Sequence, residues 1–178
     1  IHLAITSEWD NVKWRPVSHC PSITDAHGYF YPMIWPNKNY PRQALLQNNF
    51  KAEDIEKEFR AQIELALKKI PRITHISGHM GCTNMNDTVR PISKRLAQEY
   101  KLDIDMQGVK SVSYEGAHKT SAEKKQSFIA MLNKLQPGNT YLFVEHPGLN
   151  TPELQAITHI GYENVAEDRQ GVTDIWTD

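Results

Sequence analysis

The sequence predicts an α/β protein whose parallel strands are joined by helices. Short apolar segments alternate with amphipathic helical segments along the 178 residues, and this order is typical of parallel strands with helical crossovers. The predicted strands are nearly continuous apolar runs, as expected for strands that are covered on both faces. Four such strands are visible, so a closed barrel would need further strands from outside this sequence.

The first strand is predicted over residues 1–6, where side chains of two kinds alternate. Ile1, Leu3 and Ile5 lie on one face of this strand. His2 lies on the opposite face, so its imidazole is a candidate for a role outside the apolar core.

Residues 7–51 are predicted to form a long irregular segment, because they include five prolines. Ordered loops of this length are usually functional. The segment is rich in aromatic residues, which leaves two interpretations open: the rings pin the loop to the body, or they form a wall of a sugar-binding groove. On the second interpretation, the substrate-binding aromatic residues are Trp9, Trp14, Tyr31 and Trp35.

The clearest helix is predicted over residues 52–70. Its apolar side chains recur at spacings of three and four, and its acidic first turn and basic last turn match the helix dipole. Pro71 ends this helix, and a second strand follows over residues 72–79. Another helix is predicted over residues 87–100, with Asp87 as its N-cap.

The remaining predicted elements continue the same alternation. A short strand covers Leu102 to Met106, and Ser121 caps a third helix after a loop. A strongly apolar strand spans residues 140–145, and a further helix begins near Pro152. The inward side chains of the third helix are predicted to be Phe128, Ile129, Leu132 and Leu135.

The chain is predicted to be one domain over residues 1–178 that is incomplete at both ends. It starts without Met inside a strand pattern and stops abruptly, so we expect missing segments, and the localisation stays open. The net charge of −1 and the absence of any basic stretch beyond a Lys-Lys pair exclude the electrostatic pattern of a nucleic-acid partner. No apolar run approaches the roughly 20 residues that a membrane span needs.

Two histidines stand at the ends of predicted strands, and each is followed by turn-forming residues. His79 ends the second strand and His146 ends the fourth. Because active sites of such folds lie at the carboxyl ends of strands, both are candidate site residues. Each could instead be a hydrogen-bonded structural histidine. Asp103 and Asp105 share one face of a predicted strand, where a solvated or ion-paired location is favoured over a role as ligands.

Four motifs follow one another along nearly the whole chain. Residues 1–6 resemble the pattern Gly-x-His-Leu-x-Leu-Thr, and Arg15-Pro16 with residues 21–30 resemble an Arg-Pro … Pro-Ser-Leu-x-Asp-x-x-Gly-x-Phe loop. Residues 74–79 are similar to Thr-His-Leu-Asp-Ser-His, and residues 146–148 to a His-Pro-Gly turn. Together these motifs resemble those of the YdjC-like carbohydrate deacetylases.

The resemblance implies a distorted (β/α) barrel, related to polysaccharide deacetylases, that removes N-acetyl groups from an amino sugar or oligosaccharide. It implies one divalent metal ion, zinc or magnesium, with His2 and His79 as ligands. A third ligand and the general base are expected before Ile1, from an Asp-Asp motif. We expect His146 to be the catalytic acid, because imidazole titrates near neutrality. Arg15 joins the expected substrate-binding residues.

Two departures from the family pattern affect polar groups near the expected site. Ser77 replaces the aspartate of Asp-Ser-His, which removes a carboxylate that could orient a ligand. Gly81 stands where many members have a second histidine. The alternative functions are a glycosidase with paired carboxylates and a carbohydrate-binding barrel without catalytic activity. The expected partner is an N-acetylated sugar, and a homodimer is one possible assembly.

Overall fold

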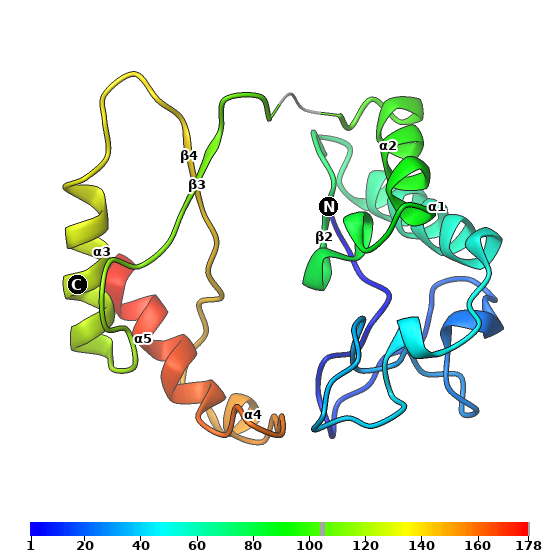
Figure 1. The fold of residues 1–178 in the computed structure, drawn as a ribbon, viewed down its shortest axis with the longest axis horizontal. Helices are drawn as coiled ribbons and strands as arrows, with labels where there is room; N and C mark the ends of the chain where they lie inside the picture. The colour runs from blue at the N-terminus through cyan, green and yellow to red at the C-terminus, as the bar shows by residue number, and fades with distance from the viewer. Residues whose placement is uncertain (104–105, 178) are drawn as a thin grey trace. The chain divides into compact units, whose positions relative to one another are not determined.

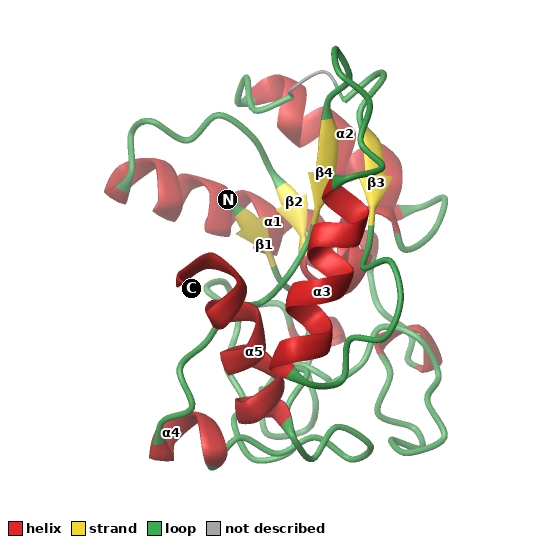
Figure 2. Ribbon diagram, turned by 90° about the vertical axis from the view of Figure 1, so that its left-hand side faces the viewer, coloured by secondary structure: helices red, strands yellow, loops and turns green. Residues whose placement is uncertain are grey.

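The computed structural model describes residues 1–103 and 106–177. The chain forms two compact units, Ile1–Ile104 and Asp105–Asp178, which we call the N-terminal unit and the C-terminal unit. Each unit contains one pair of parallel strands (Figures 1 and 2). This pairing confirms the α/β class with parallel strands that the sequence predicts.

In the N-terminal unit, the sheet is much shorter than predicted. Strand β1 (His2–Leu3) pairs with β2 (Ser77–Gly78), so that His2 is the register partner of Ser77. The pairing stops at Ala4, because the side chain of Gln62 takes its place. The Ala4 N–H donates to Gln62 Oε1 at 3.0 Å, and Gln62 Nε2 donates to the Ala4 carbonyl at 2.7 Å. A helix side chain therefore satisfies the backbone groups that a longer ladder would use.

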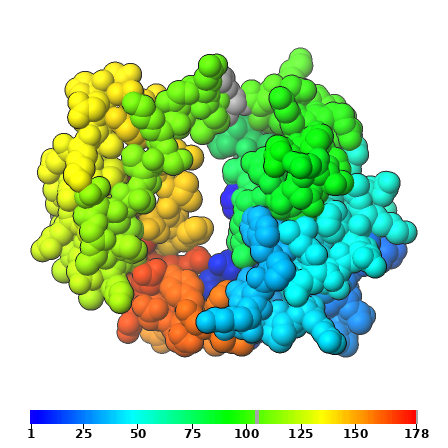
Figure 3. Space-filling view, viewed as in Figure 1, coloured from blue at the N-terminus to red at the C-terminus, as the bar shows by residue number. Residues whose placement is uncertain are grey.

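Helix α1 (Ala52–Lys69) forms where the sequence predicts it, and buries Ile55, Phe59 and Ile63. Helix α2 (Val89–Glu99) begins two residues after the predicted start of residue 87. The green surface in Figure 3 includes this helix. The prediction of Asp87 as N-cap is wrong.

The start of α2 is fixed by Asn86. Its Oδ1 accepts hydrogen bonds from the N–H groups of Thr88 at 3.1 Å and Val89 at 2.9 Å. Asp87 is exposed and pairs with Arg90 at 2.8 Å. The amide therefore takes the role that the sequence assigned to the neighbouring carboxylate.

Residues 7–51 form an ordered loop that packs into the core of the N-terminal unit. It contains two short 3₁₀ turns, Pro21–Ile23 and Leu45–Gln47, and isolated bridges such as Thr24 with Phe30. The loop, β1 and both helices share one apolar core, whose largest fully buried side chains include Phe30, Phe59, Leu3, Ile23, Leu45 and Leu96.

In the C-terminal unit, β3 (Lys110–Val112) pairs with β4 (Tyr141–Phe143). Strand β3 lies in a segment that was predicted to be loop. The prediction of a strand over residues 102–106 is wrong for Leu102. The Leu102 N–H donates to the Ala97 carbonyl at 2.7 Å, so this residue belongs to the turn that ends α2. Ile104 and Asp105 lie outside the described residues.

The described residues of the C-terminal unit also form the helices α3 (Ser121–Leu132), α4 (Pro152–Gln155) and α5 (Val165–Thr177). The start of α4 confirms the helix predicted near Pro152, whereas α5 was not predicted. Helices α3 and α5 lie side by side (Figures 1 and 2). None of the helices in the described parts of the chain is long and apolar enough to cross a membrane.

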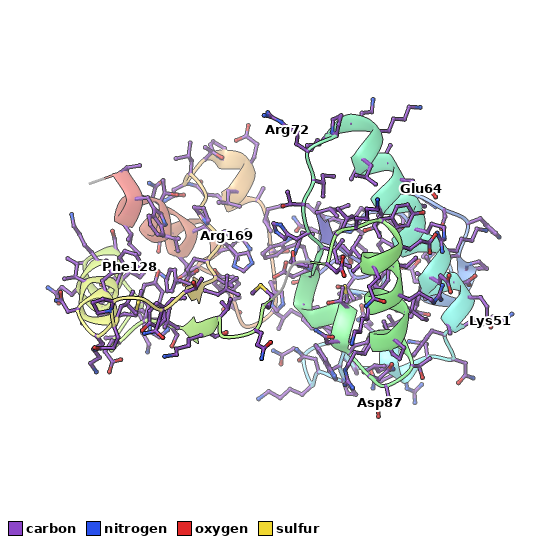
Figure 4. The ribbon with its side chains drawn as sticks, turned by 90° about the horizontal axis from the view of Figure 1, so that it is seen from above. Lys51, Glu64, Arg72, Asp87, Phe128 and Arg169 are labelled. Carbon is purple, nitrogen blue, oxygen red and sulfur yellow. The ribbon has the colours of Figure 1, made fainter. Side chains whose placement is uncertain are left out.

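The buried face of α3 differs from the predicted one. Phe128, labelled in Figure 4, and Met131 are buried, and the Phe128 ring lies 5.0 Å from the ring of Trp176 on α5, measured between centroids. Ile129 and Leu132 remain 49% and 44% exposed, which contradicts the prediction that they point inward. The helix ends at Leu132, so Leu135 does not belong to it.

Candidate metal and substrate site

The structure brings His2 and His79 together. His2 lies on β1, and His79 is the first residue after β2. Their ring centroids are 5.7 Å apart, with the edge of one ring toward the face of the other. Because β1 and β2 are parallel neighbours, two residues that are 77 positions apart in the sequence meet at one edge of the sheet.

The chain turns sharply at His79. A 3₁₀ segment, His79–Asn84, replaces the last part of the predicted strand, and Met80 and Gly81 adopt left-handed backbone angles with φ of 48° and 68°. The segment folds back over Gly78, where a Cβ would lie 2.8 Å from the backbone nitrogen of Thr83. Glycine is therefore required at the position where the family motif has serine.

Cys82 anchors this turn to β1, since its Sγ donates to the Leu3 carbonyl at 3.3 Å. Burial raises the pKa of the Cys82 thiol to about 12. Burial also raises the pKa of the Cys20 thiol to about 12. Both thiols lie buried in the apolar core of the N-terminal unit.

Each histidine of the pair has a polar neighbour. The Oγ of Ser77 lies 2.7 Å from Nδ1 of His2. The Glu8 Oε2 lies 3.5 Å from Nε2 of His79. Glu8 has a left-handed backbone with φ of 63°, and its N–H donates to the Pro32 carbonyl at 3.0 Å. Sequence analysis missed Glu8, because a single acidic residue after a strand carries no recognisable spacing.

The predicted substrate-binding aromatic residues divide into two groups. Trp9 is only 8% exposed, and Trp14 and Tyr31 are half-buried against the core. Burial, reinforced by the charge of Asp25, raises the pKa of Tyr31.

Trp35 differs from these three, because it is 46% exposed and lies beside the turn that carries His79. A Cβ on Gly81 would stand 3.4 Å from the Cη2 atom of its ring. Trp35 is therefore an exposed aromatic side chain close to Gly81, two residues after His79. Trp9, Trp14 and Tyr31 pack against the core, as the first interpretation of the loop expects, whereas a sugar-binding role for Trp35 stays a prediction.

Arg15 borders a surface pocket of about 580 Å³ between residues 15–21 and 24–28. Its Nη1 donates to the His27 carbonyl at 2.9 Å, and its guanidinium lies 4.2 Å from the centroid of the Tyr29 ring. Only part of its donor set is used in these contacts, so the remaining N–H groups are available to a polar ligand.

His146 lies in the C-terminal unit, after β4, and is exposed. The turn that follows it is fixed to α5: the Gly148 N–H donates to the Arg169 carbonyl at 3.1 Å, and Thr173 Oγ1 donates to the Gly148 carbonyl at 2.8 Å. Arg169 is labelled in Figure 4. The close approach of Gly148 to this helix, where a Cβ would stand 3.2 Å from Arg169 Cβ, explains the glycine of the His-Pro-Gly motif.

The described residues fit a metal ion in part. Two adjacent imidazoles suit a borderline cation such as zinc, but a catalytic zinc site commonly uses three protein ligands. Within residues 1–103 and 106–177, no group of three or more His, Cys, Asp or Glu side chains is placed to hold a metal ion. The histidine pair is therefore a partial ligand set.

Parallel strand pairs joined by helices define an α/β protein, and the two histidines that meet beside the β1–β2 pair form its candidate site. Comparison with known families identifies it further. The chain belongs to the YdjC-like protein family, whose profile matches residues 1–178.

Two known proteins are similar to this chain, one in sequence and one in fold. A carbohydrate deacetylase of Thermus thermophilus is 28% identical over 180 aligned residues, which cover 88% of this chain and 64% of that protein. The chain thus spans a little less than two thirds of the length of this relative. A crystal structure of a putative cellobiose-phosphate cleavage protein from Enterococcus faecalis V583 superimposes with a TM-score of 0.65 at 18% identity. The superposition covers 100% of this chain and 69% of the chain from Enterococcus faecalis. At this identity the similarity supports the fold alone.

Proposed function

We propose that this chain is the larger part of a carbohydrate deacetylase, which hydrolyses the N-acetyl group of an amino sugar or oligosaccharide. The observation that carries the proposal is the meeting of His2 and His79 at one edge of the β1–β2 pair in a YdjC-like protein. The similarity to a carbohydrate deacetylase supports it. In this proposal, residues 1–178 belong to one distorted (β/α) barrel domain, and the parallel strand pairs are consistent with that architecture.

His2 and His79 would hold one divalent metal ion, together with a third ligand from outside the described residues. Imidazole ligands favour zinc over magnesium. Such an ion, when bound, polarises the acetamide carbonyl and lowers the pKa of a coordinated water.

The remaining residues would bind and orient the sugar. Trp35 offers an exposed ring beside the histidine pair, on which the C–H face of a sugar can stack. Arg15 offers donors to hydroxyl or carbonyl oxygens along its pocket. The predicted role of His146 is to donate a proton to the nitrogen of the departing amine.

The test uses the full-length protein that contains this chain and measures acetate released from a panel of N-acetylated oligosaccharides. We expect His79→Ala to reduce the rate by at least about 100-fold, and chelation followed by zinc to remove and restore it. His75→Ala is the matched control, because His75 is an exposed histidine of the same segment that contacts Thr74 instead. Unchanged acetate release by His79→Ala, or by the metal-stripped protein, would contradict the proposal. Release of reducing sugars without acetate would indicate a glycosidase.

A further inference from the structure

Ser77 makes a short polar contact with His2, one member of the histidine pair. Its Oγ lies 2.7 Å from Nδ1 of His2. The two residues are register partners in the β1–β2 pair, so their side chains project from neighbouring strands on the same face of the sheet. The Ser77 N–H donates to the Ile1 carbonyl at 2.9 Å, which fixes this register from the backbone. Strand pairing therefore places the Ser77 hydroxyl and the His2 imidazole next to each other.

We propose that Ser77 is the positioning residue of His2: its hydroxyl accepts the Nδ1–H, which leaves Nε2 as the nitrogen that faces the metal. This inference rests on the proposed function, in which His2 is a ligand. A neutral imidazole carries one N–H, and the partner of one ring nitrogen determines the state of the other. Metal-binding histidines commonly hold their orientation through such a second contact.

The contact gives Ser77 a role that the replacement of aspartate by serine did not suggest. The family motif has aspartate there, and sequence analysis treated its replacement as the loss of an orienting group. In the structure, Ser77 contacts the imidazole directly, without a negative charge. A neutral acceptor withdraws the Nδ1 proton less strongly than a carboxylate does, so it makes Nε2 a weaker electron-pair donor. Ser77 therefore orients His2 and also sets its affinity for metal below that of an aspartate-supported ligand.

The first experiment titrates the full-length, metal-free protein with Zn²⁺ and measures the dissociation constant by calorimetry. We expect Ser77→Ala to weaken zinc binding about 10-fold, Ser77→Thr to retain it, and Ser77→Asp to strengthen it. Thr74→Ala is the matched control, because Thr74 Oγ1 makes the same kind of contact, 3.0 Å from Nδ1 of His75. Equal zinc affinity in Ser77→Ala and in the unchanged protein would overturn the inference, as would weaker binding by Ser77→Asp.

The second experiment needs no metal. The ¹⁵N chemical shifts of the metal-free protein, with His2→Ala used to assign the signals, report which nitrogen of His2 carries the proton. We expect the Nδ1–H form in the unchanged protein, and the Nε2–H form would contradict the inference.

The two proposals fail differently. Zinc affinity that is unaffected by His2→Ala would overturn the proposed metal site. Affinity that His2→Ala lowers but Ser77→Ala does not would overturn only the role of Ser77.

Discussion

The N-terminal and C-terminal units differ in how they satisfy a buried charged side chain. Among residues 1–103 and 106–177, the buried charged residues are Glu58 on α1 in the first unit and Lys124 on α3 in the second. A charged group in the interior must be paired or hydrogen-bonded to be tolerated. The comparison shows which segments each unit needs to hold in place.

Glu58 binds a loop through that loop's backbone. Its carboxylate accepts hydrogen bonds from the N–H groups of Val17 at 2.9 Å and Ser18 at 2.8 Å, and from the Ser18 hydroxyl at 2.7 Å. Gln62 donates to the same carboxylate at 2.8 Å and also binds Ala4, next to β1. One turn of α1 therefore connects the segment that carries Arg15 to the strand that carries His2.

Lys124 binds a helix through side chains. Its Nζ lies 2.9 Å from Oδ1 of Asp168 on α5 and 5.2 Å from the centroid of the Tyr114 ring. The hydroxyl of Tyr162 donates to the other oxygen of Asp168 at 2.6 Å. This cluster fixes α5, which in turn holds the turn after His146. The difference is that loss of Glu58 leaves the N–H groups of Val17 and Ser18 without their acceptor. Loss of Lys124 instead leaves the partly exposed Asp168 carboxylate without its cation.

The largest effect is expected from Glu58→Ala. It leaves two backbone N–H groups and a hydroxyl without their acceptor, each at a cost of roughly 1–3 kcal/mol, so we expect the free energy of unfolding to fall by about 4 kcal/mol. Glu58→Gln should lose less, because one oxygen remains. Urea denaturation measures both, with the exposed Glu53→Ala as control. A loss no larger than that of Glu53→Ala would show that the loop does not depend on this carboxylate.

A smaller effect is expected from Lys124→Met. It removes the cation but leaves Asp168, whose side chain is 24% exposed, with its hydrogen bond from Tyr162. We expect a loss of about 2 kcal/mol, below the range for breaking a fully buried pair. Lys125→Met, at the neighbouring half-buried lysine, is the control. If Lys124→Met costs as much as Glu58→Ala, the contrast between the two units is wrong.

The Lys124–Asp168 pair also predicts that the stability of the protein depends on pH. Burial acts to raise the pKa of Asp168, but hydrogen bonds from Tyr162 and Lys124 and the Lys124 charge outweigh it, so the net pKa is lowered. A lowered folded-state pKa stabilises the protein above the unfolded value of about 3.9 and loses this effect as the pH falls through the folded value. Asp168→Asn should therefore reduce stability at about pH 7, with the deficit shrinking below about pH 4. A deficit that stays constant down to about pH 2 would point to packing instead of charge.

How far the sequence predicts the fold depends on whether the determining contacts are local. Helix α1 was predicted almost to the residue, because its apolar spacing, its terminal charges and Pro71 all lie within it or directly after it. The lengths of β1 and β2 were not predictable, because the side chain of Gln62, from another element, ends the pairing. Strand β3 was missed since Lys110 and Ser111 are exposed polar residues, and only pairing with β4 makes them a strand.

The candidate site follows the same rule. The proximity of His2 and His79 was expected from the family motifs, and the structure confirms that proximity. Glu8 depends on a left-handed backbone that local propensity does not indicate. The contact between Ser77 and His2 depends on strand register, which a single sequence does not specify when only two residues of each strand pair.

The smallest effect separates two adjacent hydroxyl groups at the start of α3. The sequence predicts Ser121 as the N-cap, but in the structure the N-cap is Thr120. The Thr120 Oγ1 accepts a hydrogen bond from the Glu123 N–H at 3.2 Å, and Glu123 Oε2 accepts one from the Thr120 N–H at 3.1 Å. Ser121 instead donates to Asp174 at 2.7 Å in an exposed contact between α3 and α5. We expect Thr120→Ala to cost about 1 kcal/mol and Ser121→Ala about 0.5 kcal/mol or less. Thermal unfolding of the two variants, which differ by one position, decides the matter: a larger loss for Ser121→Ala would mean that the contact with α5, rather than the cap, holds the start of this helix.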